Sequence, residues 1–136
     1  MTNQKSNKTI HISLWIAQAL LGAMFLMAGA MKATQAIEVL AESLPWATTM
    51  PLALVRFIGI SELLGGLGML LPSLLRIKPV LTVWAGYGLA AVMVLAAIFH
   101  ATRGEFPAIG ANLLIAAIAL FVAWGRSKKA PIAAKS

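Results

Sequence analysis

The sequence predicts an all-α fold, a four-helix transmembrane bundle, and three observations favour it. The chain has 136 residues, which is the size of a single domain. Apolar residues make up 60% of it and charged residues only 11%, whereas a soluble domain has about 25% charged residues. Four long apolar runs follow one another with polar connections between them. So few charges cannot cover a surface that faces water, and we therefore expect an integral membrane protein.

Each apolar run is long enough to cross the membrane as a helix. We expect spans at about residues 10–31, 52–71, 80–101 and 107–125. Each has roughly 19–22 residues, and about 20 helical residues cross a hydrocarbon core of about 30 Å. The connections at 72–79 and 102–106 are short, which makes neighbouring helices antiparallel. The predicted bundle thus occupies residues 10–125, between a basic N-terminus at 1–9 and a basic tail at 126–136, which we expect to be disordered.

The first run also has features of a secretory signal peptide. Lys5 and Lys8 precede it, and the residues at 28–30 (Ala-Gly-Ala) resemble a small-residue cleavage site. The apolar core of a signal peptide has about 7–15 residues, however, and this run has about 20. We therefore expect the run to be retained as a membrane helix.

The distribution of lysine and arginine predicts the orientation in the membrane. If the N-terminus is cytoplasmic, eight basic residues lie inside: Lys5, Lys8, Arg76, Lys78, Arg126, Lys128, Lys129 and Lys135. Only Lys32, Arg56 and Arg103 then lie outside. Cytoplasmic segments of membrane proteins are the ones enriched in these residues. We therefore expect both termini in the cytoplasm and the protein in the bacterial cytoplasmic (inner) membrane, as a multi-pass protein.

The net charge of +7 is likewise explained by the orientation of the protein in the membrane. Its basic residues gather at the termini and in one short loop, where they attract anionic lipid headgroups, so we expect the lipid bilayer and no nucleic acid as partner. Trp15, Trp84 and Trp124 fall near the predicted cytoplasmic ends of the spans, where an aromatic belt is expected. The sequence has no cysteine, which excludes disulfides and thiol chemistry.

The one long connection, residues 33–51, predicts a short amphipathic helix at the outer interface. Its apolar positions recur at helical spacing: Ile37, Leu40, Ala41 and Leu44. Glu38 and Glu42 lie on the opposite side, and Pro45 and Pro51 end the segment. This helix is either a simple connector or a lid over the outer mouth of the bundle.

Five polar residues fall in the outer half of the predicted bundle. These candidate ligand-binding residues are Lys32, Arg56, Glu62, His100 and Asn112, of which Glu62 and His100 are also candidates for catalysis. Ionisable residues inside a membrane are costly, so they usually face the bundle interior and pair. The inner half has almost no ionisable group between the helices. We therefore predict an outward-facing polar pocket above an apolar floor.

Helical phase indicates which faces turn inward. Gly59, Glu62 and Gly66 share one face of the second span, and small residues there allow close packing. Arg56 is about 120° from Glu62 around that helix, so the two do not form an intrahelical pair. Partners for both are expected on other helices. Two further stripes are predicted to face inward: Gln18, Gly22, Gly29 and Lys32, and also Gly86, Ala90, Met93, Ala97 and His100.

Three segments resemble the DoxX-like family of small four-helix bacterial membrane proteins. They are LGAMFLMAGAMKAT at 21–34, VRFIGISELLGGLGMLLP at 55–72 and AAIFH at 96–100. The R-x-x-G-x-x-E-x-x-G pattern of the second segment is the most specific of them. By this resemblance Lys32, Arg56, Glu62 and His100 match recurrent polar positions of the family. The resemblance implies accessory subunits of membrane oxidoreductases with quinone as a partner, and more distantly sterol-isomerase-like and chaperone-like proteins.

Three functions stay open at this point. The pocket could bind a quinone-like or lipid-like molecule, with Glu62 and His100 relaying protons. Alternatively, Glu62 could act as acid or base in an isomerase-like enzyme on an apolar substrate. The third alternative is a structural or assembly protein, whose glycines pack helices within one bundle or between protomers of an oligomer. The sequence contains no haem, flavin or metal motif, and the cofactor stays open, with quinone as the possibility that the resemblance implies. Transport is the weakest alternative.

Overall fold

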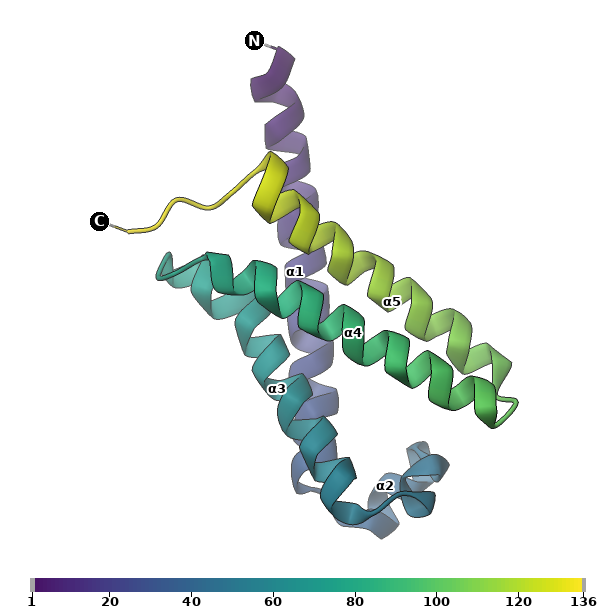
Figure 1. Cartoon of the computed structure of the whole chain (residues 1–136). Helices are drawn as coiled ribbons and strands as arrows, with labels where there is room; N and C mark the ends of the chain where they lie inside the picture. The colour runs from purple at the N-terminus through teal and green to yellow at the C-terminus, as the bar shows by residue number, and fades with distance from the viewer. Residues whose placement is uncertain (1, 136) are drawn as a thin grey trace.

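The computed structural model describes residues 2–135, and the chain is helical throughout most of that range (Figure 1). Four long helices are α1 (Thr2–Thr34), α3 (Leu52–Leu75), α4 (Val80–Thr102) and α5 (Phe106–Trp124). Between α1 and α3 lie the short helix α2 (Ile37–Ser43) and the 3-10 helix η1 (Pro45–Thr49). A π-helical turn, η2 (Gly125–Lys129), continues α5. No strand occurs among the described residues, and the predicted fold class is confirmed.

The four long helices are long and apolar enough to cross a membrane. The candidate spans among the described residues are Asn7–Thr34, Leu52–Leu75, Val80–Thr102 and Phe106–Lys129. Large apolar side chains such as Phe57, Leu64 and Leu95 lie exposed on the outer surface of these helices. In water such a surface would be unfavourable, whereas lipid tails cover it at no cost.

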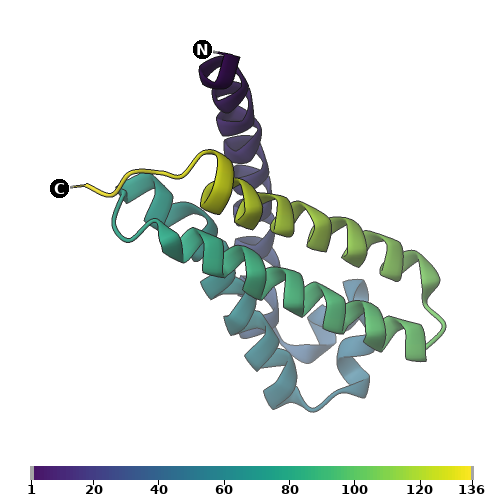
Figure 2. The same cartoon turned by 45° about the horizontal axis from the view of Figure 1, so that its top comes forward.

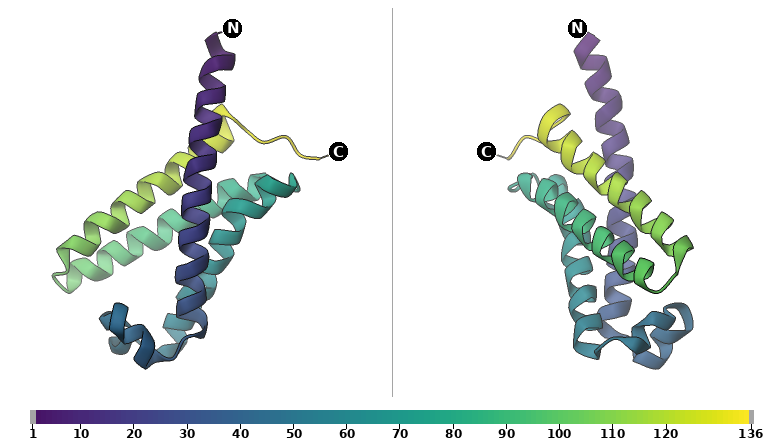
Figure 3. Two further views of the ribbon diagram at one scale, coloured as in Figure 1. Left: turned by 180° about the vertical axis from the view of Figure 1, so that it is seen from behind. Right: turned by 45° about the vertical axis from the view of Figure 1, so that its right-hand side comes forward.

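The helices associate as two pairs. Helix α1 packs mainly against α3, and α4 packs mainly against α5, while contacts between α3 and α4 join the pairs. Figures 1 and 2 show α4 and α5 as an antiparallel hairpin that crosses α1 and α3. The two pairs meet near the chain termini and diverge toward the end that holds α2 (Figure 3). We call the end with α2 and η1 the outer end and the end with the termini the inner end, following the predicted orientation.

Glycines bring the helix backbones of each pair together. A Cβ on Gly59 would lie 2.5 Å from the backbone nitrogen of Ala33, and one on Gly29 would lie 2.6 Å from that of Leu63. Between α4 and α5, a Cβ on Gly86 would lie 2.9 Å from the carbonyl oxygen of Ala119. Backbone atoms cannot move aside as a flexible side chain can, so these three positions require glycine at the present distance between the helices. The predicted close packing of the face that carries Gly59 and Glu62 is confirmed.

The connection from α1 to α3 forms the predicted short helix and lies across the outer end. Leu40 on α2 is fully buried with Ala47 and Val55. The ring of Trp46 contacts the ring of Phe99 on α4, with centroids 5.8 Å apart and an edge-on geometry. The α2–η1 segment therefore contacts both helix pairs at the end where they diverge.

The inner end differs from the prediction in two respects. The tail was expected to be disordered, yet the Nε of Arg76 donates to the carbonyl of Ala133 and the backbone N–H of Lys135 donates to the carbonyl of Arg76. The inner half was expected to have almost no ionisable group between the helices, yet Arg126 is buried there, with 4% of its surface exposed. The expectation failed because the helical turn η2 carries Arg126 back between the helices.

Candidate functional site

Lys32 and Glu62 form an ion pair in the outer half of the bundle. The Nζ of Lys32 lies 2.6 Å from Oε1 of Glu62, and the side chains are 12% and 2% exposed. Lys32 lies in the last turn of α1, and Glu62 lies in the middle of the α3 face that packs on α1. Gly59, one turn before Glu62, contacts the backbone of Lys32, so the close approach of the helices makes this pair possible. Pairing is the arrangement that makes two buried charges tolerable in a membrane.

Arg56 lies beside this pair but does not bond to Glu62. Its Nη1 donates to the carbonyl of Lys32, at 3.1 Å, and to the carbonyl of Gln35, at 2.5 Å. Carbonyls at the C-terminal end of a helix have no partner within the helix, and a guanidinium satisfies them well. Arg56 therefore fixes the end of α1, and with it the backbone that carries the ammonium group of Lys32.

His100 belongs to a separate cluster at the turn between α4 and α5. Its Nδ1 lies 3.0 Å from Oε1 of Glu105, and the Nε of Arg103 donates to the same oxygen at 2.8 Å. The hydrogen bond from His100 is the main cause that lowers the pKa of Glu105 below its ordinary value, and Arg103 lowers it further. Sequence reasoning did not select Glu105. Its position five residues after His100, in the predicted connection at 102–106, was the available signal.

Asn112 lies half-buried on α5, and its amide nitrogen is buried without an acceptor among the described residues. The side-chain oxygen of Gln35, just after α1, is likewise buried without a donor in the same part of the chain. Buried amide groups of this kind are uncommon and are usually satisfied by water or a ligand. The structure thus brings Lys32, Glu62 and Arg56 together on the α1–α3 pair, while His100 and Asn112 lie on the α4–α5 pair.

The outer cluster, which consists of Lys32, Glu62 and Arg56, has unused hydrogen-bonding capacity. A lysine ammonium has three N–H donors, and Nζ of Lys32 bonds one side chain among the described residues. A carboxylate has two oxygens, and Oε1 of Glu62 is the one that accepts from Lys32. The cluster can therefore donate to a carbonyl oxygen and accept from a hydroxyl group. No group of three or more His, Asp or Glu side chains among the described residues could hold a metal ion.

A second polar cluster, which sequence reasoning missed, crosses the inner half. The amide of Gln18 on α1 donates to the carbonyl of Met69 at 2.7 Å and to the hydroxyl of Ser73 at 3.2 Å. Ser73 in turn bonds the hydroxyl of Thr82 on α4, at 2.7 Å. The Nε of Arg126 donates to Oε1 of Gln18, at 2.6 Å. We call these residues, Gln18, Ser73, Thr82 and Arg126, the inner network.

The fold and these sites define a class: the chain is an integral, multi-pass membrane protein built on four apolar helices. More specifically, it belongs to the DoxX-like family, whose model matches residues 16–122. Searches of curated proteins and of solved structures give no match. The matched range contains Lys32, Arg56, Glu62, His100 and Asn112, whereas Arg126 lies beyond its end.

Proposed function

We propose that this membrane protein binds a small apolar molecule with a carbonyl or hydroxyl group, such as a quinone or a lipid, in the outer half of the bundle. The observation that carries the proposal is the Lys32–Glu62 pair. Its two groups are nearly dehydrated and retain unused donors and acceptors. In a low-dielectric environment such groups bind a polar ligand atom more strongly than they would in water.

Two further observations support the same region. The helix pairs diverge at the outer end, and the α2–η1 segment lies across it (Figure 3). Buried amide atoms without partners occur at Gln35 on one side and at Asn112 on the other. An apolar molecule with polar groups at its head would supply partners for such atoms. The resemblance to accessory subunits of membrane oxidoreductases favours a quinone as this molecule, and such a subunit would act in the bacterial cytoplasmic membrane.

A structural role is the second candidate function. The two bonds from Arg56 to the end of α1 favour it, because they hold α1 and α3 together without any ligand. Under this alternative the Lys32–Glu62 pair only locks the two helices.

Native mass spectrometry of the protein, purified with its lipids in mild detergent, separates the two candidates. We expect wild-type protein to carry a bound apolar molecule that Glu62→Gln loses. The matched control is Glu42→Gln, which removes an exposed carboxylate of α2 and should retain the molecule. Thermal unfolding of each variant is measured in parallel. If the wild type carries no molecule, and Glu62→Gln only lowers the unfolding temperature, the structural role is correct instead. Release of a chemically altered molecule by the wild type alone would identify the isomerase-like enzyme.

A further inference from the structure

The guanidinium of Arg126 is buried at the inner end among neutral partners. Its Nη1 donates to Nδ1 of His11 and to the carbonyl of Ala130, each at 2.8 Å, and its Nε donates to Gln18. The Trp15 ring lies against the guanidinium, with 5.3 Å from Cζ to the ring centroid. The remaining nitrogen, Nη2, is buried and has no acceptor among the described residues. The protein therefore satisfies two of the three guanidinium nitrogens.

No acidic side chain neutralises this charge. The sequence contains four acidic residues, Glu38, Glu42, Glu62 and Glu105. Glu38 and Glu42 lie on α2, Glu62 pairs with Lys32, and Glu105 lies in the turn after α4, so all four belong to the outer half. A buried charge that lacks an opposite charge is strongly unfavourable, and arginine does not lose its proton to avoid the cost. Because none of these acidic side chains lies beside Arg126, an anion that binds there would compensate its charge.

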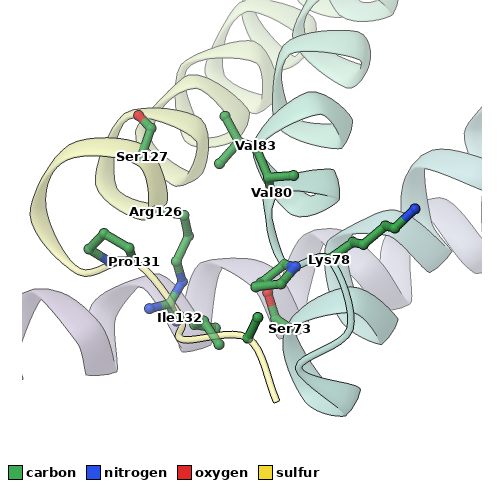
Figure 4. Close-up of a pocket in the computed structure, with 10 residues that line it drawn as sticks. Ser73, Lys78, Val80, Val83, Arg126, Ser127, Pro131 and Ile132 are labelled. Carbon is green, nitrogen blue, oxygen red and sulfur yellow. The ribbon is translucent and has the colours of Figure 1, made fainter. Parts of the chain in front are cut away.

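A cleft of about 500 Å³ opens beside Arg126 and has the chemistry to hold that anion (Figure 4). Its polar lining comes from Arg126, Lys78 and the hydroxyls of Ser73 and Ser127, and no acidic residue contributes to it. Figure 4 shows the side chain of Arg126 extending toward Ile132 of the tail, while that of Lys78 points away from Arg126. The rest of the lining is apolar and includes Val83. A cationic head with apolar walls fits an amphipathic anion.

We propose that this cleft binds the phosphate group of an anionic phospholipid. Arginine presents a planar fork of N–H groups that matches phosphate oxygens, and both Arg126 and Lys78 line the cleft. Four exposed basic residues at this end attract anionic headgroups to it: Arg76, Lys128, Lys129 and Lys135. The exposed apolar side chains of Val80 and Leu81 on α4 give the acyl chains a surface beside the cleft. A free phosphate would use only the polar part of this site.

The test measures the unfolding temperature and the bound mass of the full-length protein in mild detergent. Phosphatidylglycerol, phosphatidylcholine with the same acyl chains, and inorganic phosphate are each titrated. We expect phosphatidylglycerol to bind and to raise the unfolding temperature, phosphatidylcholine to bind much more weakly, and inorganic phosphate to have no effect. Loss of hydrogen bonds to a charged group in Arg126→Gln should weaken phosphatidylglycerol binding by at least about tenfold. The matched control Lys128→Gln removes an exposed charge two residues away and should weaken it by at most about fivefold.

Arg126→Gln also disturbs the inner network, so a second variant keeps the proposal falsifiable. Lys78→Gln leaves that network intact and removes the other cation of the cleft; it should weaken binding by about fivefold without changing the unfolding temperature of the lipid-free protein. Equal binding of phosphatidylglycerol and phosphatidylcholine would overturn the proposal. So would a shift with inorganic phosphate that equals the shift with phosphatidylglycerol, or unchanged affinity in both Arg126→Gln and Lys78→Gln.

Discussion

The two ends of the bundle stabilise a buried cation in opposite ways. At the outer end, Lys32 is neutralised by Glu62 across the α1–α3 interface. At the inner end, Arg126 bonds to neutral acceptors and lies against the Trp15 ring, with no acidic side chain of the described residues bonded to it. An ion pair contained within the protein leaves a site that suits neutral ligands, whereas an uncompensated cation suits an anion. We therefore propose a different class of ligand for each end.

The largest predicted effect is on the outer ion pair. Glu62→Leu leaves the ammonium of Lys32 without its opposite charge, and we expect a loss of about 3–5 kcal/mol in the free energy of unfolding. The double variant Lys32→Met with Glu62→Leu should recover most of that loss, since two apolar side chains of similar volume replace the pair. Reversible unfolding in detergent measures the free energy of unfolding of the wild type, the two single variants and the double variant. Additive losses in the double variant would show that the two groups do not stabilise each other.

The next prediction concerns the inner network. Gln18→Leu removes the acceptor of Nε of Arg126 and both bonds of the Gln18 amide to α3. Because a hydrogen bond to a charged group is lost, we expect a loss of about 1.5–3 kcal/mol. Ser13→Ala is the control on the same helix, because in the described part of the chain the hydroxyl of Ser13 bonds the carbonyl of Thr9 within α1 and no other helix. A Gln18→Leu protein as stable as the control would mean that the network is not stabilising.

The close contact between α1 and α3 predicts a loss of stability somewhat smaller than that of Gln18→Leu. In Gly59→Ala the new Cβ meets backbone atoms of Lys32 and Ala33 and forces α1 and α3 apart, at a cost of about 1–3 kcal/mol. Gly88→Ala is the matched control, since a Cβ there has no atom within 4 Å. The same unfolding assay compares them, and equal stability of the two variants would contradict the close contact.

The smallest effect is a dependence on pH at the turn between α4 and α5. The hydrogen bond from His100, with help from Arg103, lowers the pKa of Glu105 below its ordinary value of 4.5. A carboxyl with a lowered pKa stabilises the folded state above its unfolded pKa, and this contribution is lost as the pH falls through the lowered value. The unfolding temperature should therefore decrease below about pH 4.5, and less so in Glu105→Gln. An identical decrease in that variant would show that other groups cause it.

The sequence predicted the outer end better than the inner end, for a physical reason. Lys32 and Glu62 interrupt apolar runs, so their positions and helical phase predicted inward faces and a partner for Glu62 on another helix. His100 and Asn112 were expected in the same pocket as that pair, and the structure places them on the other helix pair. The contact of His100 with Glu105 depends on the conformation of the turn after α4. The spacing of the residues does not predict that conformation.

Arg126 escaped the sequence reasoning because it follows the last apolar run and resembles a basic residue that sets orientation. Its burial depends on η2, which continues α5, and on Gly125, where a Cβ would lie 2.5 Å from the side chain of Leu14. This contact between α5 and α1 brings Arg126 beside Gln18. A neutral polar residue such as Gln18 in the middle of an apolar run was the signal that a partner was required.

The claim that the two ends bind different classes of molecule has one direct test. Native mass spectrometry compares wild type, Glu62→Gln and Arg126→Gln, each purified with its lipids and then supplied with phosphatidylglycerol. We predict that Glu62→Gln loses the neutral apolar molecule and still binds phosphatidylglycerol, and that Arg126→Gln shows the reverse. If both variants lose both molecules, or neither variant loses either, the two ends are not separate binding sites and the account is wrong.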